Sequence, residues 1–237
     1  MKKKAVAVVM TAVMALGMVS AVSVQAGIED KTLIVGFDAE YPPYGYMDEN
    51  GEYTGFDLEL AQAVCDLEGW ELEKKPINWD SKDMELNSGS IDCIWNGFTM
   101  NGREDDYTFS EPYVDNSQVI VVADDSGIEK LTDLTGKTVG VQAASAALDL
   151  LQSEEEGGQK ELADTFGALN EFADYNTAFT ELQAGALDAL AIDVGVAKYQ
   201  LNSRGEGFKI LDETLNTEQY AIGFKKGNTE LCDIVNA

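Results

Sequence analysis

Arginine is scarce in this chain, and one of its two arginines closely follows an apolar run. The 237 residues include 43 acidic and 16 basic side chains, and the only arginines are Arg103 and Arg204. The apolar run at 91–95 is predicted to be a buried strand. At the end of a strand, the Arg103 guanidinium could hold a carboxylate through two parallel hydrogen bonds. A surface ion pair with an acidic residue at 104–106 is the alternative.

Further polar and aromatic side chains lie just beyond other predicted strands. In open α/β sheets, ligands bind beyond the carboxyl ends of the strands. The candidate ligand-binding residues are Asp38, Tyr41, Trp79, Thr99, Arg103, Ser145 and Asp193. Arg103 can bind a carboxylate, and Asp193 can bind an ammonium group or begin a helix as its N-cap. Tyr41 and Trp79 can enclose the rest of the ligand. This combination predicts a site for a zwitterion.

The composition removes several kinds of chemistry. The chain contains no histidine, so nucleophilic catalysis with a histidine base and most zinc sites are excluded. Its three cysteines are Cys65, Cys93 and Cys232, which allow at most one disulfide and show no metal-binding spacing. Cys65 and Cys93 are expected to be small buried side chains. We therefore expect no catalytic residue, no metal and no cofactor.

Short apolar runs alternate with amphipathic segments along the chain. This alternation predicts an α/β fold with largely parallel sheets. The predicted strands are 33–37, 71–78, 91–96, 118–122, 137–141, 186–192 and 219–224, and the clearest helices are 56–65 and 144–154. The segment at 85–92 resembles the segment at 181–188, and each predicts a helix end, a glycine and a buried strand. Two similar α/β lobes would explain this repeat.

The N-terminus predicts export. Three lysines at 2–4 precede an almost wholly apolar run at 5–22, and small residues end at Ala26. This is the pattern of a secretory signal peptide spanning 1–26. Since no cysteine follows the predicted cleavage point, we expect no lipid anchor and a periplasmic or other extracytoplasmic location. The formal net charge of −27 makes nucleic acid an unsuitable partner.

Two motifs and the region around Asp193 resemble a known family. The runs at 55–64 and 109–113 are similar to those of polar amino-acid substrate-binding proteins of ABC importers, which belong to the bacterial extracellular solute-binding proteins of family 3. The resemblance covers 32–237. It implies the two-lobed α/β fold of type 2 periplasmic binding proteins, with mixed sheets and two hinge strands. It also implies a membrane permease and an ATPase as partners.

The resemblance implies a role for each candidate residue. It assigns the ligand α-carboxylate to Arg103, helped by Thr99 and by Ser145 at a helix start. It assigns the α-ammonium to Asp193 and the ligand side chain to Asp38, with the two aromatic residues as walls. Members of this family commonly have one more residue between the threonine and the arginine, so the loop in this chain is expected to be tighter.

Domain bounds follow from the same comparison. Lobe 1 is expected to comprise 27–116 and 220–237, and lobe 2 to comprise 117–219. Hinges are expected at 116–120 and 217–221. The family normally continues with further helices that pack on lobe 1, so this sequence resembles a chain truncated at its C-terminus.

The predicted function is capture of a polar amino acid by a monomeric extracytoplasmic binding protein that delivers it to an ABC importer. A basic amino acid, an amide-bearing one and cystine all fit the acidic residues near the site. The alternatives are an exported dehydratase of amino-acid-related compounds on the same scaffold, or an amino-acid sensor module. An enzyme without histidine would have to use an acid such as Asp38, Glu40 or Asp80.

Overall fold

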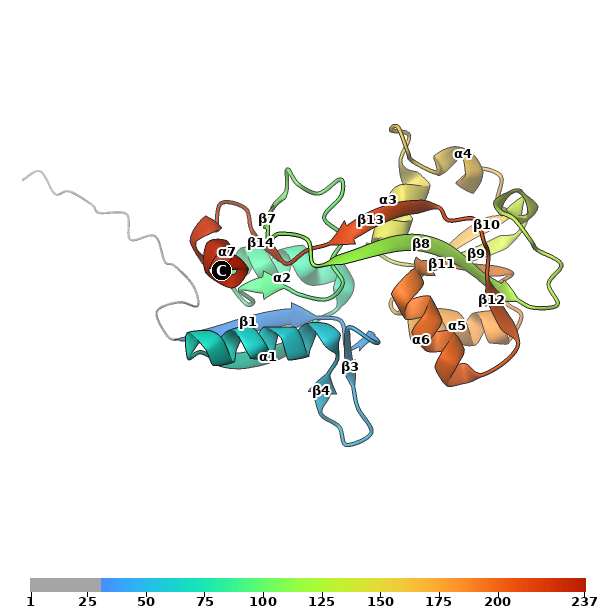
Figure 1. Cartoon of the computed structure of the whole chain (residues 1–237). Coiled ribbons are helices and arrows are strands. Elements are labelled where there is room, and N and C mark those ends of the chain that lie inside the picture. Colours follow the sequence, from blue (N-terminus) through green and yellow to red (C-terminus); the bar gives the residue numbers. More distant parts are fainter. Residues whose placement is uncertain (1–30) are drawn as a thin grey trace, which may run out of the picture.

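Two α/β lobes lie side by side and are joined by a pair of long strands (Figure 1). The computed structural model describes residues 31–237, and the predicted signal peptide at 1–26 lies outside the described residues. We call the part built on the five-stranded sheet lobe 1 and the part built on the six-stranded sheet lobe 2. The expected two-lobed α/β fold with mixed sheets is confirmed.

Lobe 1 contains a mixed sheet with the strand order β5-β1-β6-β14-β7. Its strands are β1 (Thr32–Phe37), β5 (Glu71–Pro76), β6 (Cys93–Ile94), β7 (Tyr107–Phe109) and β14 (Gly223–Lys225). Its helices are α1 (Phe56–Glu68), the 3-10 turn η1 (Trp79–Ser81), α2 (Lys82–Ser88) and α7 (Thr229–Asn236). Helix α1 buries Leu58, Ala61 and Cys65, which share one face at helical spacing. It ends where Gly69 takes the left-handed conformation at φ 69°.

A small hairpin sheet extends from lobe 1 below the first strand (Figure 1). It consists of β2 (Glu40–Tyr41), β3 (Gly45–Met47) and β4 (Tyr53–Thr54). Asp48 forms the turn of the hairpin, because its Oδ1 accepts hydrogen bonds from Asn50 N at 2.8 Å and Glu52 N at 2.9 Å. The hairpin brings Tyr41 to the interface between the lobes.

Lobe 2 contains a sheet with the order β10-β9-β11-β8-β12, and β13 pairs with β8. Its strands are β8 (Val114–Ala123), β9 (Thr138–Gln142), β10 (Ala168–Phe172), β11 (Ala189–Asp193), β12 (Phe208–Ile210) and β13 (Asn216–Tyr220). Its helices are η2 (Leu131–Leu134), α3 (Ala146–Gln152), α4 (Lys160–Ala163), α5 (Tyr175–Gln183) and α6 (Val194–Arg204).

Strands β8 and β13 pair antiparallel and connect the two lobes (Figure 1). Along the chain, β8 leads from lobe 1 into lobe 2, and β13 leads back. Their register pairs Asn216 with Gln118 and Tyr220 with Val114. The prediction of one strand at 219–224 is wrong. The chain pairs with β8 as far as Tyr220 and then joins the lobe 1 sheet at Gly223, opposite β6 and β7. Two strands form because the two halves of this segment belong to different sheets.

The buried core follows the lobes, with one cluster at their interface. Lobe 1 buries all three cysteines as free thiols, which confirms Cys65 and Cys93 as core residues. The interface cluster combines Tyr41 and Tyr44 from lobe 1 with Tyr175 and Ile192 from lobe 2. Among residues 31–237, no helix is both long enough and apolar enough to span a bilayer.

Candidate ligand-binding site between the lobes

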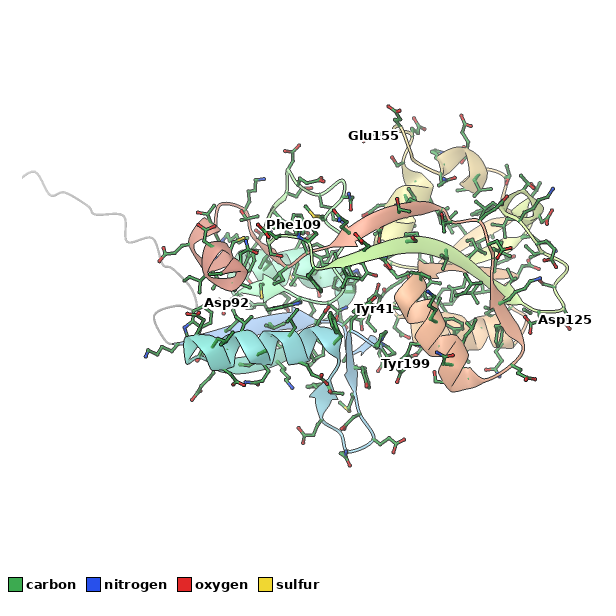
Figure 2. All side chains as sticks on the ribbon, in the orientation of Figure 1. Tyr41, Asp92, Phe109, Asp125, Glu155 and Tyr199 are labelled. Carbon is green, nitrogen blue, oxygen red and sulfur yellow. The ribbon has the colours of Figure 1, made fainter. Side chains whose placement is uncertain are left out.

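A small cavity lies between the lobes. Its lining consists of Tyr41, Trp79, Gly97, Thr99, Arg103, Gln142, Ser145, Ala146 and Asp193. Six of the seven predicted site residues therefore meet around one space, although they come from five separate segments of the chain. Tyr41 lies between the two halves of the molecule (Figure 2).

Arg103 reaches the cavity from the loop between β6 and β7. Gly102 permits the turn at φ 80°, and Arg103 N donates to Met100 O at 3.0 Å. The guanidinium lies over the Phe98 ring, 5.0 Å from its centre. Its Nη2 pairs with Asp149 Oδ2 of α3 at 2.7 Å, so this ion pair joins the two lobes. The alternative pairing with an acidic residue at 104–106 is wrong, because no ion pair within residues 31–237 links Arg103 to those residues.

Asp193 stands at the carboxyl end of β11 and is almost fully buried, with 3% of its surface exposed. Its Oδ1 accepts hydrogen bonds from Asn116 Nδ2 at 2.8 Å, Gln118 Nε2 at 2.7 Å and Tyr220 Oη at 2.6 Å. It occupies the N-cap position of α6, yet its side chain makes no capping hydrogen bond. The expectation that Asp193 begins a helix as its N-cap residue is confirmed, while its carboxylate bonds to Asn116, Gln118 and Tyr220 and not to the helix N–H groups.

The electrostatic environment of Asp193 disfavours its charged form. Burial raises the pKa of Asp193 to about 6, and the charge of nearby Glu218 adds to the rise. Hydrogen bonds from Tyr220, Tyr41 and Gln118 oppose that rise. An ammonium group in the cavity would favour the ionised form, since an opposite charge stabilises a buried carboxylate.

The hydroxyl groups of Thr99 and Ser145 both make hydrogen bonds within the protein. Thr99 Oγ1 donates to Glu218 Oε1 at 2.7 Å. Ser145 is the N-cap of α3, and its Oγ accepts from Leu148 N at 3.2 Å. The expected helix start at Ser145 is confirmed, with the helix beginning at Ala146 rather than 144. Ser145 also interacts with the Tyr175 hydroxyl, whereas Thr99 uses its O–H on Glu218.

Two aromatic side chains form walls of the cavity. Tyr41 packs against Tyr175 with ring centres 6.0 Å apart, and its hydroxyl lies 3.4 Å from that of Tyr220. Trp79 meets Phe98 edge to face at 5.7 Å, and Lys82 Nζ lies 5.1 Å from the Trp79 ring centre. Contacts with neighbouring side chains therefore hold both rings in place.

Asp38 is the one predicted residue outside the cavity lining. Its Oδ2 accepts from Gln142 Nε2 at 2.7 Å, and Gln142 lines the cavity. Its Oδ1 accepts from Glu40 N at 2.8 Å. Burial raises the pKa of Asp38 to about 6, and the charges of Asp174 and Glu40 raise it further. Asp38 is therefore linked to the cavity through the Gln142 side-chain amide, which lies between the Asp38 carboxylate and the cavity.

Two larger hollows adjoin the cavity and differ in charge. One, with about 1150 Å³ of empty space, shares Trp79 with the cavity, and its charged lining residues are Asp38, Glu40, Asp80, Glu85 and Asp174. The other has about 1500 Å³, and both of its cations, Lys82 and Arg103, lie among six acidic residues. The first hollow is thus purely acidic in its charged groups, while the second carries the guanidinium.

Three important residues were not among the predicted set: Gln142, Asp149 and Glu218. Gln142 is the last residue of β9, so the strand-end rule could have found it. Asp149 lies inside α3 and is exposed, and nothing in its sequence context marks it. Glu218 lies inside β13, and only the crossing of the strands brings it to Thr99.

The sequence profile of the bacterial extracellular solute-binding proteins, family 3, matches residues 33–237. The L-cystine-binding protein TcyJ of Escherichia coli (strain K12) is 29% identical, over 94% of this chain and 85% of TcyJ. The arginine-binding extracellular protein ArtP of Bacillus subtilis (strain 168) is 35% identical, over 87% of this chain and 78% of ArtP.

Solved structures agree with the sequence comparisons. An ABC uptake transporter substrate-binding protein from Streptococcus pneumoniae with bound histidine has a TM-score of 0.82 and 34% identity. The match covers 88% of this chain and 85% of that one. The class of protein is therefore the type 2 periplasmic binding proteins. The chain belongs to the bacterial extracellular solute-binding proteins of family 3.

Proposed function

We propose that this protein captures a polar amino acid between its lobes and delivers it to the membrane permease of an ABC importer. The observation that carries the proposal is the pairing of charges around one cavity. Arg103 comes from lobe 1 and Asp193 from lobe 2, and both line the same space. A zwitterion is the small solute that satisfies a guanidinium and a carboxylate together.

In this proposal each residue of the cavity has a distinct role. Arg103 binds the α-carboxylate, and the Ser145 hydroxyl donates to it from the start of α3. Asp193 receives the α-ammonium. Tyr41 and Trp79 enclose the part of the side chain nearest the backbone. Burial of the charged groups in a closed cavity strengthens these hydrogen bonds relative to water.

We infer the domain bounds and hinges from the two crossing strands. Lobe 1 is assigned 27–116 and 220–237, and lobe 2 is assigned 117–219. The hinges at 116–120 and 217–221 fall on β8 and β13, which pair along the boundary. Opening about these strands would admit the ligand, and closing would bury it.

The ligand side chain is proposed to point toward Trp79 and the acidic hollow. Five acidic residues and no basic residue are among the lining of that hollow. This favours a basic amino acid and leaves room for cystine or an amide-bearing side chain. Relatives named for cystine and arginine, and a solved structure holding histidine, support this range.

An exported enzyme on this scaffold is the second candidate. Asp38 is an acid with a raised pKa next to the cavity, but both of its oxygens accept hydrogen bonds from the protein. The family consists of binding proteins. Incubating the protein with each candidate ligand and following product by mass spectrometry distinguishes turnover from binding.

The first experiment is a thermal-shift screen of residues 27–237 against the common amino acids and cystine. A ligand that binds only the folded state raises the melting temperature by mass action. We expect a clear rise with one class of amino acid, confirmed by calorimetry at one site per chain. A cooperative melt with no shift for any amino acid would contradict the proposal.

A further inference from the structure

Glu218 is a second buried carboxylate beside Asp193. It lies in β13 with 4% of its surface exposed, close to the 3% of Asp193. The two carboxylates share their hydrogen-bond donors. Asn116 Nδ2 donates to Asp193 Oδ1 at 2.8 Å and to Glu218 Oε1 at 2.8 Å. Gln118 Nε2 donates to the same two oxygens at 2.7 and 2.8 Å.

The orientation of the two amides is determined by this pair of acids. Each NH₂ group has two hydrogens, and each places one on either carboxylate. If either amide were turned over, its carbonyl oxygen would face two carboxylate oxygens. As oriented, Asn116 Oδ1 and Gln118 Oε1 are buried and have no hydrogen-bond partner. The cluster therefore has more acceptors than donors.

The cluster also lacks a positive charge. Within residues 31–237, none of the ion pairs includes Asp193 or Glu218. Arg103 shares the cavity with Asp193 but is paired with Asp149. Buried carboxylates are costly without a cation, and the cost grows when two lie together. The acid pair is thus incomplete within the described protein.

We propose that Glu218 is a positioning residue for the ligand's ammonium group, paired with Asp193 so that the two carboxylates together receive one cation. Asp193 makes the contact, because Asp193 lines the cavity and Glu218 does not. Glu218 holds the amides and Thr99 in place behind it. This inference rests on the proposed amino-acid binding.

Glu218 also determines what Thr99 can offer. A threonine hydroxyl has one hydrogen, and Thr99 donates it to Glu218 Oε1 at 2.7 Å. Toward the cavity, Thr99 Oγ1 then presents only acceptor lone pairs. It suits the ligand ammonium and cannot donate to the ligand carboxylate. The Thr99 side chain is therefore assigned to the ammonium group, in place of the carboxylate that the family resemblance implies.

The affinity for the ligand should depend on pH, because binding of the ammonium group should remove a proton from the acid pair. Four tyrosines, Tyr41, Tyr44, Tyr175 and Tyr220, face Asp193, and their raised pKa values keep them neutral in acid. The Arg103 guanidinium lines the same cavity as Asp193. Asp38 also titrates near pH 6, but the causes of its shift are burial, Asp174 and Glu40, so a change at Glu218 leaves it unaltered.

The test is Glu218→Gln, which keeps the acceptor Oε1 and removes the charge. Two measurements are made on residues 27–237, with L-arginine, L-histidine and L-cystine as probes for the second. The first is the carbon NMR titration of Asp193 without ligand. We expect its pKa to fall by about one unit, because the like charge is gone. The second is calorimetry from pH 4.5 to 8. We expect roughly tenfold weaker binding at pH 7.5 and an acid loss of affinity that begins at lower pH than in the wild type.

Asp115→Asn is the matched control. Asp115 lies on β8, which pairs with the strand that carries Glu218, is exposed, and accepts from Gln219 Nε2 at 3.0 Å. The Asp115→Asn change removes one negative charge near the hinge without contacting the acid pair. The Asp193 titration and the pH dependence of ligand affinity should therefore both match the wild type. Melting without ligand, at pH 7.5, checks that each variant is folded.

An unshifted Asp193 titration in Glu218→Gln overturns the inference, whether or not any probe binds. A uniform loss of affinity with an unchanged pH profile also overturns it, since that result describes a purely structural role. Failure of every probe to bind the wild type counts against the proposed function instead, and the ligand-free titration still decides the role of Glu218.

Discussion

The two lobes share a folding unit of three strands, which are β1, β5 and β6 in lobe 1 and β9, β10 and β11 in lobe 2. In each unit, an aspartate just before the third strand forms hydrogen bonds with the first strand. In lobe 1, Asp92 N donates to Ile34 O at 2.8 Å, and Ile34 N donates back to Asp92 Oδ2 at 2.8 Å. In lobe 2, Asp188 N donates to Thr138 O at 2.9 Å, and Thr138 N donates back to Asp188 Oδ2 at 2.8 Å. The repeat visible in the sequence is thus a repeat of hydrogen bonds.

The equivalence extends to the interface between the lobes. Gly36 in β1 and Gly140 in β9 hold the same place in the pairing with β6 and β11. Two residues beyond them stand Asp38 and Gln142, whose side chains bond to each other across the interface at 2.7 Å. Equivalent strand ends therefore face one another.

The lobes differ in the residues that come after the last strand of the unit. Gly97 and Asp193 occupy equivalent positions after β6 and β11, and both line the cavity. Gly97 has φ 56°, and a Cβ there would lie 2.9 Å from the Tyr220 ring. Lobe 1 continues into the loop that bears Arg103, and lobe 2 enters α6. The shared unit is scaffold, and the binding chemistry depends on the residues just past it.

The largest expected effect is a loss of ligand affinity when the lobe 1 side of the site is changed. Arg103→Ala should weaken amino-acid binding by about 100-fold or more, because the ligand carboxylate would be buried without a partner. Calorimetry measures the loss.

The matched control for that variant is Arg204→Ala, at the only other arginine. Arg204 lies in α6 of lobe 2, bonds to Gln200 and covers Phe179. Its replacement should leave affinity within about twofold. Equal losses in both variants would contradict the assignment of the carboxylate site.

The next largest effect is on the free energy of unfolding, and it compares Asp92 with Asp188, which hold equivalent places in the two lobes. Asp92 is buried, whereas the side chain of Asp188 is 40% exposed and lies 3.6 Å from Lys137. Asp92→Ala should lower the free energy of unfolding by about 2–3 kcal/mol, because it leaves Ile34 N without a partner in the core. Asp188→Ala should cost about 1 kcal/mol, since water can reach the freed group. Urea unfolding measures both.

Ligand affinity should stay unchanged in both aspartate variants. A loss of affinity without a loss of stability would mean that the shared unit takes part in binding.

A pH effect on stability is expected from Asp57 in lobe 1. Burial raises the pKa of Asp57 to about 7 from its ordinary 3.8, against the lowering effect of hydrogen bonds from Gly97 N and the Tyr113 hydroxyl. The protonated form is favoured in the fold, so this stabilisation is complete below pH 4 and is lost as pH rises through 7. Asp57→Asn cannot ionise, and should be about 2 kcal/mol more stable than the wild type at pH 8. The difference should vanish near pH 4 in thermal melts.

The smallest effect tests whether the two units are equivalent in packing. A Cβ on Gly36 would lie 2.4 Å from Ile91 Cδ1, and one on Gly140 would lie 2.5 Å from Leu187 Cδ1. Each glycine-to-alanine change should cost about 1 kcal/mol, because the end of an aliphatic side chain must move. Urea midpoints should fall by similar amounts, and a strong difference would show that the units are packed unequally.

Much of the fold could be predicted from local patterns. Helix α1 follows from the spacing of Leu58, Ala61 and Cys65, and the hairpin turn follows from the chemistry of Asp48. The segment at 219–224 could not be divided correctly, because its apolar pattern is continuous while its partners change sheet after Tyr220. Pairing between distant strands leaves no local mark in such a run.

The candidate site shows the same division. Asp193 and Ser145 could be identified because each directly follows a strand or starts a helix. Asp149 and Glu218 could not, because the first is an ordinary exposed helix residue and the second an acid within a strand. Their importance comes from contacts with residues 46 and 119 positions away in the chain.

The sequence by itself determined the class of fold, the absence of histidine chemistry and the kinds of side chain at the strand ends. These depend on composition, periodicity and turn residues, which act over short distances along the chain. Only the tertiary structure decided that Asp149 pairs with Arg103 and that Glu218 stands behind Asp193. Charge pairing in a buried interface depends on separation in space, and the packing of two lobes across β8 and β13 sets that separation.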